Sequence, residues 1–232
     1  MKILVLMSAN CLRLLLLLSC VHLCWLFSPY VAAQTDYVNY DWQLKRDRHD
    51  IRIYLSKVPD SKFRAVRAEM QVDASVESLV ALITDLPNCK KWVVMCQKAE
   101  LVEQLSSTES IVYTHNDVPF PVRDRDVYSH VVWSHDEATG VVKMRSEAID
   151  ASKYPVRRGR VRIVYAVSEW HFKPLANGQV AIESFAHVDP NGAVPAWLIN
   201  FLIVDAPYKT LKQMRARVQQ PQYQNAEVAL FQ

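Results

Sequence analysis

The sequence predicts an α+β protein in which helices bracket a large antiparallel β-sheet. From about residue 96 to residue 188, alternating strand-like segments follow one another, separated by turn signals such as Thr139-Gly140 and Asn177-Gly178. Before this region, apolar residues recur at helical spacing from Val76 to Leu86. After it, the stretch 191–218 carries the last strong helix signal of the chain. Strands that follow one another without intervening helices favour antiparallel pairing, and a sheet of this size tends to curl.

The elements of the amino-terminal half are predicted from shorter patterns. Asp41 to Arg48 are expected to form a short first helix with Trp42 as its apolar anchor. The alternation from Ile51 to Leu55 predicts a strand, and Phe63 to Val72 is its expected partner. The helix that begins near Val76 is expected to end at Pro87, and residues 88–92 to be irregular. The later strands are expected at 96–104, 110–116, 123–133, 141–149, 161–173 and 180–188.

The final helix is expected to change character along its length. From Pro195 to Val204 only Asn200 is polar, which indicates a half enclosed on more than one side. Beyond Tyr208 the pattern becomes amphipathic, and Pro207, which lacks an N–H, predicts a kink between the halves. Two interpretations remain open: a lid over a cavity, or an ordinary packed C-terminal helix.

The first 33 residues have the layout of a secretory signal peptide. Lys2 and Arg13 supply positive charge, an apolar core runs to Phe27, and Val31-Ala32-Ala33 is a small-residue cleavage signature. We therefore expect export to the periplasm or secretion, with a mature chain of residues 34–232. The alternatives are a retained membrane anchor and lipidation at Cys20.

Net charge and chain length limit the classes of partner and the number of domains that the chain can have. Residues 1–33 contain two of the 27 Lys and Arg and none of the 24 Asp and Glu, so the mature chain has a formal charge of +1. This gives no case for a nucleic-acid partner. The mature length suits a single domain, with a core expected at about residues 41–219.

Two cysteines remain in the mature chain, Cys89 and Cys96. Seven residues apart in an oxidising compartment, they could close a small disulfide loop or remain two separate thiols. Neither has a second Cys or His at zinc-site spacing.

No sequence motif makes a positive case for catalysis. The chain has no GxSxG elbow, no HExxH pair and no glycine-rich phosphate loop, so we expect no metal, no cofactor and no enzyme activity. The run Arg123-Asp124-Arg125-Asp126 stands out. Strand alternation sends its arginines and aspartates to opposite faces, either as a salt-bridged strand start or with one charge pointing into an apolar pocket.

The order of these signals resembles the START family, the lipid-transfer domains related to steroidogenic acute regulatory protein, and most of all its small secreted bacterial members. Pro119-Phe120-Pro121 followed by Arg125-Asp126 is close to the family pattern P-x-P-x-x-x-R-D. Further matches are Trp42 with residues 50–54, Thr84-Asp85 with Trp92, residues 169–174, and residues 189–192 with Pro195 and Trp197. The resemblance implies a helix-grip fold: a curved antiparallel sheet wrapped around a long C-terminal helix, with an internal hydrophobic tunnel for one lipid.

The resemblance also implies a function and a site. We expect one lipid or other hydrophobic small molecule to be bound and carried between membranes by a monomer that contacts membranes transiently. The predicted ligand-binding residues are Arg125, Asp126, Tyr165, Val167, Trp197, Phe201 and Leu202. Of these, Trp197 and Phe201 are four residues apart and share a helix face.

Two other classes of function stay open. A cyclase- or aromatase-like enzyme of the same superfamily would need acid and base groups converging in the tunnel, with His130, Glu147, Glu169, Glu183 and His187 as candidates. A structural or partner-binding envelope protein would have a filled core instead of a cavity.

Overall fold

The computed structural model describes residues 39–155 and 157–228. The signal peptide predicted for residues 1–33 and the lipidation alternative at Cys20 lie outside this part of the chain. Within it, no helix is long and apolar enough to cross a membrane.

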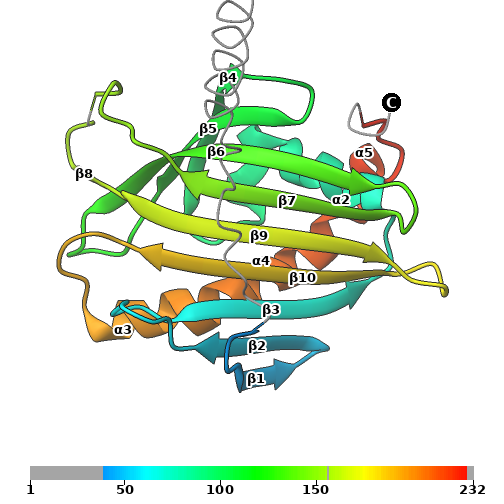
Figure 1. Cartoon of the computed structure of the whole chain (residues 1–232), viewed down its shortest axis with the longest axis horizontal. Coiled ribbons are helices and arrows are strands. Elements are labelled where there is room, and N and C mark those ends of the chain that lie inside the picture. Colours follow the sequence, from blue (N-terminus) through cyan, green and yellow to red (C-terminus); the bar gives the residue numbers. More distant parts are fainter. Residues whose placement is uncertain (1–38, 156, 229–232) are drawn as a thin grey trace, which may run out of the picture. The chain divides into compact units, whose positions relative to one another are not determined.

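Ten strands form one curved sheet (Figure 1). Along the sheet the strand order is β1-β2-β3-β10-β9-β7-β6-β5-β4, and each pair of neighbours is antiparallel. The short strand β8 lies off this path and pairs with β6 in parallel. The strands are β1 (Gln43–Arg48), β2 (Ile51–Ser56), β3 (Ala65–Val72), β4 (Cys96–Gln104), β5 (Glu109–Asn116), β6 (Asp124–Asp136), β7 (Val141–Ala148), β8 (Arg160–Arg162), β9 (Tyr165–Pro174) and β10 (Val180–Asp189).

The first predicted helix is wrong, because Gln43–Arg48 forms the edge strand β1. His49 and Asp50 have φ values of 53° and 58°, and two consecutive positive φ angles suit the tight turn of a two-residue hairpin. This turn folds β1 back onto β2, whose Ile51, Ile53 and Leu55 are buried, with Arg48 opposite Ile51. Strand pairing therefore outweighs the local helix preference of this polar segment.

The long strand predicted for residues 161–173 is divided into β8 and β9. β8 pairs with the start of β6, where Asp126 lies opposite Arg162. The Asp126 carbonyl accepts a hydrogen bond from the backbone N–H of Ile163 at 2.8 Å. After a two-residue break, β9 enters the sheet between β10 and β7. A single straight strand could not reach both positions.

Helix α2 (Val76–Thr84) begins where the sequence indicated. Ser75 is its N-cap, and the Ser75 hydroxyl accepts a hydrogen bond from the backbone N–H of Ser78 at 3.1 Å. The segment beyond it, expected to be irregular, is mostly a 3₁₀ helix, η2 (Leu86–Lys91), with Pro87 in its first turn. Proline is tolerated there because its missing N–H has no partner to lose.

The C-terminal helix has three parts: α3 (Ala196–Asn200), the π-helical segment η3 (Phe201–Asp205) and α4 (Ala206–Arg217). Pro207 lies in the first turn of α4, so the break in the α-helical pattern falls just before it. A short helix, α5 (Pro221–Gln224), follows.

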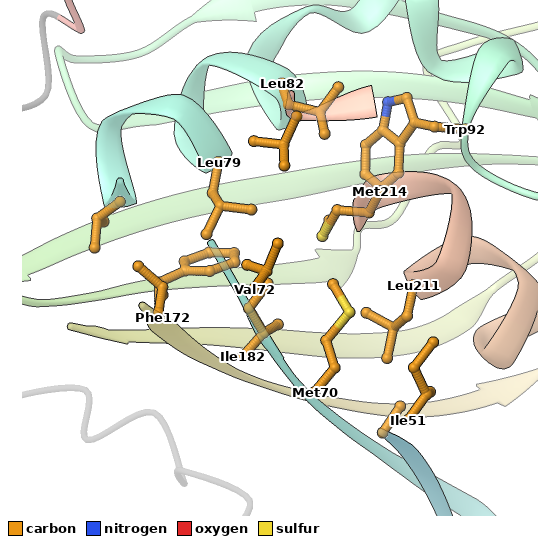
Figure 2. Packing of buried hydrophobic residues seen from close by; sticks show 14 of the residues in the cluster. Ile51, Met70, Val72, Leu79, Leu82, Trp92, Phe172, Ile182, Leu211 and Met214 are labelled. Atoms are coloured by element: carbon orange, nitrogen blue, oxygen red, sulfur yellow. The ribbon is translucent and has the colours of Figure 1, made fainter. Parts of the chain in front are cut away.

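The core lies between the sheet and the helices α2 and α4 (Figure 2). Figure 2 labels side chains from these helices, from Trp92 and from strands β2, β3, β9 and β10: Leu79, Leu82, Leu211, Met214, Trp92, Ile51, Met70, Val72, Phe172 and Ile182. Each fully buried aliphatic or aromatic side chain contributes about 1.5–3 kcal/mol relative to an exposed one. This cluster fixes α4 across the sheet and positions the site described next.

Candidate ligand-binding site

A predominantly apolar cavity of about 450 Å³ lies between the sheet and the C-terminal helix. We call it the helix-side cavity, and its walls include Trp170 of β9, Ser184 and Ala186 of β10, Leu198 of α3, Leu202 of η3 and Leu211 of α4. Its volume falls within the range of about 300–1,000 Å³ that is typical of small-molecule sites. The cavity is the space that the apolar half of the final helix covers.

A second, larger cavity of about 1470 Å³ lies toward α2. We call it the α2-side cavity, and its walls include Ile83 of α2, Leu86 of η2, Ala99 of β4, Val112 of β5, Trp133 of β6 and Met144 of β7. Four residues line both cavities: Val93, Ser168, Trp170 and Thr210. The two spaces therefore adjoin at these side chains.

Arg125 lies at the wall of the helix-side cavity, as one of the two sequence interpretations expected. Its side chain is turned to the protein backbone: Nε donates to the carbonyl of Pro190 at 3.3 Å, and a terminal nitrogen donates to the carbonyl of Asn191 at 3.2 Å. It also donates to the carbonyl of Arg123. Burial, together with the nearby Arg123 charge, lowers the pKa of Arg125 below the ordinary guanidinium value. Arg125 thus ties the connection between β10 and α3 to the sheet.

Asp126 lies on the other face of β6, away from the helix-side cavity. It is fully buried, and its two carboxylate oxygens accept hydrogen bonds from Arg162 at 2.6 and 3.2 Å. The Tyr113 hydroxyl donates to the same carboxylate at 3.4 Å. The Arg162 guanidinium also lies over the Tyr128 ring. The arrangement makes Asp126 an anchor for β8.

The other predicted contact residues divide between the cavity and the surface. Leu202 lines the helix-side cavity, whereas the walls of the two cavities do not include Phe201 or Trp197. Trp197 is 51% exposed, and the Lys209 ammonium lies over the Phe201 ring. Their contact with a ligand stays a prediction.

Tyr165 and Val167 lie on the face of β9 opposite the one that lines the cavities. Ser168 and Trp170, which alternate with them along the strand, line both spaces. Tyr165 instead packs edge-on against His187 at a ring-centroid distance of 5.3 Å. The alternation was visible in the sequence, but the sequence did not show which face the helix covers.

Sequence reasoning missed the loop residues of the site. Val93, Val94 and Met95 follow η2 and line the helix-side cavity, and the Val94 backbone N–H donates to the Thr210 hydroxyl of α4 at 3.1 Å. The run Trp92-Val93-Val94-Met95 is apolar, which is the one signal that could have indicated burial of this loop.

Cys89 and Cys96 form a disulfide that closes this loop, with a Cα–Cα distance of 5.9 Å. Both cysteines are buried, and they pack with Ala99, Leu86 and Val93. The bond therefore joins the 3₁₀ helix η2 to the first residue of β4, directly beside the point where the cavities adjoin.

The acid and base candidates of the enzyme alternative do not converge on either cavity. His130 hydrogen-bonds Glu109 at 3.0 Å, and His187 hydrogen-bonds Ser61 at 2.8 Å. Glu147 and Glu169 both bind Arg145, and Glu183 lies 3.9 Å from His171, on the face of the sheet away from the helices. The walls of the two cavities include none of the five candidates: His130, Glu147, Glu169, Glu183 and His187.

One histidine, His115, lines the α2-side cavity, and it is paired with Asp124. His115 Nε2 lies 2.8 Å from an Asp124 oxygen, and the other Asp124 oxygen accepts the backbone N–H of Val118 at 3.0 Å. Burial raises the pKa of Asp124, but the bonds from Val118 and His115 outweigh this effect and lower it. The pair holds the β5–β6 connection.

In the described residues, no three His, Cys, Asp or Glu side chains are grouped to hold a metal ion.

Comparison with known proteins places this geometry in a family. The START domain model matches residues 34–223. An uncharacterized Pseudomonas aeruginosa protein, PA1579, is 34% identical over 176 residues, covering 76% of this chain and 86% of its own. The mouse phosphatidylcholine transfer protein is 24% identical over 177 residues, covering 75% and 82%. A crystal structure of a STAR-related lipid transfer protein from Xanthomonas axonopodis superposes with a TM-score of 0.70 at 31% identity, covering 77% of this chain and 99% of that one. The chain belongs to the START domain family.

Proposed function

We propose that this protein binds one lipid in the helix-side cavity and carries it between membranes. The observation that carries the proposal is the apolar cavity enclosed between strands β3, β9 and β10 and the C-terminal helix. Enclosing an acyl chain or a sterol there gains about 0.8 kcal/mol for each CH₂ group removed from water. The relative named as a phosphatidylcholine transfer protein supports a lipid as the class of ligand.

A surface at the mouth of the cavity suits transient contact with a membrane. Phe120, Val164 and Trp197 are 94%, 66% and 51% exposed, and we call these three residues the apolar rim. Each is within two residues of a side chain that lines the helix-side cavity: Val118, Ile163 and Leu198. β8 ends two residues before Val164, and α3 contains Trp197; both elements lie at the same end of the sheet in Figure 1. The Asn191 side-chain amide donates a hydrogen bond to the Arg162 carbonyl, which links the connection before α3 to β8. Exposed aromatic side chains beside an apolar opening favour a lipid interface.

Transport is proposed in preference to catalysis because none of the five candidate acid and base groups lines the helix-side or the α2-side cavity. An enzyme acting on an enclosed hydrophobic substrate needs such groups within hydrogen-bond reach of the reacting atoms. The cyclase or aromatase alternative would be supported by turnover of a bound small hydrophobic substrate, a readout that ligand binding alone does not give.

We further propose that the protein is exported after removal of residues 1–33. A disulfide between Cys89 and Cys96 supports an oxidising compartment. N-terminal sequencing of the protein recovered from its host envelope or medium is expected to begin at Gln34. Recovery of the chain from the cytosol with its leader intact would contradict export, and a lipid-modified Cys20 would favour the anchored alternative.

The test of lipid binding is native mass spectrometry of the mature chain, purified from its own host without detergent, followed by extraction of the bound lipid. We expect a monomer that carries a lipid at close to one per chain. A clean apo mass, with no uptake from a mixed panel of sterols, phospholipids and fatty acids, would contradict the proposal and favour an enzyme or a filled-core protein.

A further inference from the structure

The two cavities meet at a junction made by three elements. Val93 contributes from the loop after η2, Trp170 from β9 of the sheet and Thr210 from α4. On one side of this junction lies the predominantly apolar helix-side cavity, with a volume of about 450 Å³. On the other side lies the α2-side cavity, with a volume of about 1470 Å³. Whatever passes from one cavity to the other must pass these side chains.

Hydrogen bonds and core packing fix the loop at this junction, residues 92–95, to its neighbours. The backbone N–H groups of Trp92 and Val93 donate to the Cys89 carbonyl at 3.1 and 2.8 Å, and the Met95 carbonyl accepts the Asp117 N–H at 2.8 Å. The Thr210 hydroxyl accepts the Val94 N–H, which links the loop to the helix. Trp92 is 4% exposed and anchors the loop in the main core.

The Cys89–Cys96 disulfide closes the same loop at its two ends. Its cysteines pack against Val93, the loop residue that lines both cavities. A covalent link at this place limits how far Val93 can move away from Trp170. The disulfide therefore constrains the loop side chain that lies at the junction of the two cavities.

We propose that the segment closed by the Cys89–Cys96 disulfide is a partition that selects the ligand by length and thickness. This inference rests on the proposed function, since it concerns a lipid held in the helix-side cavity. A single unbranched chain passes the junction and extends into the α2-side cavity, whereas a thicker or branched ligand is stopped there. Val93 is the specificity-determining residue.

The volume of the helix-side cavity indicates the chain length at which a ligand reaches the partition. A water molecule occupies about 30 Å³ of liquid, and a methylene group is of similar size, so the helix-side cavity holds on the order of 15 such groups. Longer chains reach the junction. Each methylene that passes it should still raise the affinity by about fourfold, the equivalent of its burial from water.

The experiment measures competition of fatty acids of increasing length, from about ten to about twenty carbons, against a fluorescent fatty acid on the oxidised mature protein. For the wild-type protein we expect the affinity to keep rising beyond about fifteen carbons. Val93→Phe narrows the passage, so the ratio of long-chain to short-chain affinity should fall at least tenfold. Val102→Phe makes the same change on the exposed part of β4 and should keep the wild-type ratio.

A second variant tests the disulfide itself. Cys89→Ser with Cys96→Ser frees the loop, and methyl-branched fatty acids should then bind at least tenfold more tightly relative to unbranched ones of equal length. An unchanged length profile in Val93→Phe, or an unchanged preference against branching in the double serine variant, would overturn the partition while lipid binding stands. Failure of the wild-type protein to bind any chain would instead overturn the proposed function.

Discussion

The guanidinium of Arg125 donates a hydrogen bond to the carbonyl of Pro190, 65 positions away in the chain. With its bonds to the Asn191 and Arg123 carbonyls, this contact joins the start of β6 to the connection that leads into α3. The sequence left two roles open for this arginine: part of a salt-bridged strand start, or a contact with the head group of a ligand. In the structure Arg125 lines the cavity and donates to backbone carbonyls, two of them in the connection that leads into α3, and its contact with a ligand stays a prediction.

Arg125→Lys should therefore destabilise the fold. A lysine keeps the charge but cannot donate in a fixed fork, so the carbonyls of Pro190, Asn191 and Arg123 lose hydrogen-bond donors. We expect the free energy of unfolding to fall by about 2 kcal/mol. Urea denaturation measures this change, and Arg123→Lys, at an exposed neighbour, is the control. Equal stability of the two variants would show that the carbonyl contacts of Arg125 contribute little.

Asp126→Asn removes a buried charge and leaves Arg162 unpaired. Because Asp126 is fully buried and the Arg162 side chain is 11% exposed, we expect a loss of about 3–5 kcal/mol in the free energy of unfolding. Asp117→Asn, at an exposed position just after β5, should change stability by less than about 0.5 kcal/mol. A variant of Asp126 that unfolds at the wild-type urea concentration would contradict the anchoring role.

Stability should fall in acid partly through Glu169. Burial raises the pKa of this carboxyl, but hydrogen bonds from His171 and Arg145, with their charges, outweigh burial and lower it below its ordinary value of 4.5. A lowered folded-state pKa gives stability that is fully present above the unfolded pKa and is lost as pH falls through the folded one. Glu169→Gln should therefore be less stable than wild type at neutral pH, with a gap that narrows as pH falls below the ordinary carboxyl value of 4.5. Urea titrations at several pH values measure the gap, and parallel curves would contradict this account.

The apolar rim should govern the exchange of lipid with membranes. Serine at Phe120, Val164 and Trp197 removes exposed apolar surface, so transfer of lipid between vesicles should slow by about tenfold, equivalent to about 1.4 kcal/mol. Leu44→Ser with Leu105→Ser is the control, at positions on β1 and in the β4–β5 connection that are 52% and 47% exposed. Transfer at the wild-type rate by the rim variant would place the membrane contact on another surface.

Local patterns with one dominant physical cause were predictable. The fold class followed from strand-like segments without intervening helices, and helix α2 begins at Val76 because Ser75 caps it and apolar residues recur at helical spacing. Alternation correctly separated Arg125 from Asp126, since one lines the cavity and the other lies on the opposite face. The family resemblance was visible in ordered motifs along nearly the whole mature chain.

Features that depend on tertiary placement were not predictable. Gln43–Arg48 has no strong strand pattern, and it becomes a strand because β2 offers it an unpaired edge. The two faces of β9 were recognised, yet only the packing of α4 decides that Trp170, and not Tyr165, faces the cavity. The junction of the cavities lay hidden in a short loop, because its position depends on contacts with Thr210 and with the disulfide.

The measurement that tests the central claim most directly is a lipid titration of Ala186→Trp against Ala138→Trp. Ala186 lines the helix-side cavity, and a tryptophan there fills space that the lipid needs, whereas Ala138 lies in the exposed β6–β7 turn. With the lipid identified by mass spectrometry, we expect the affinity of Ala186→Trp to fall at least a hundredfold and that of Ala138→Trp to stay at the wild-type value. Wild-type affinity in a folded Ala186→Trp protein would show that the lipid binds elsewhere, and the carrier account would fail.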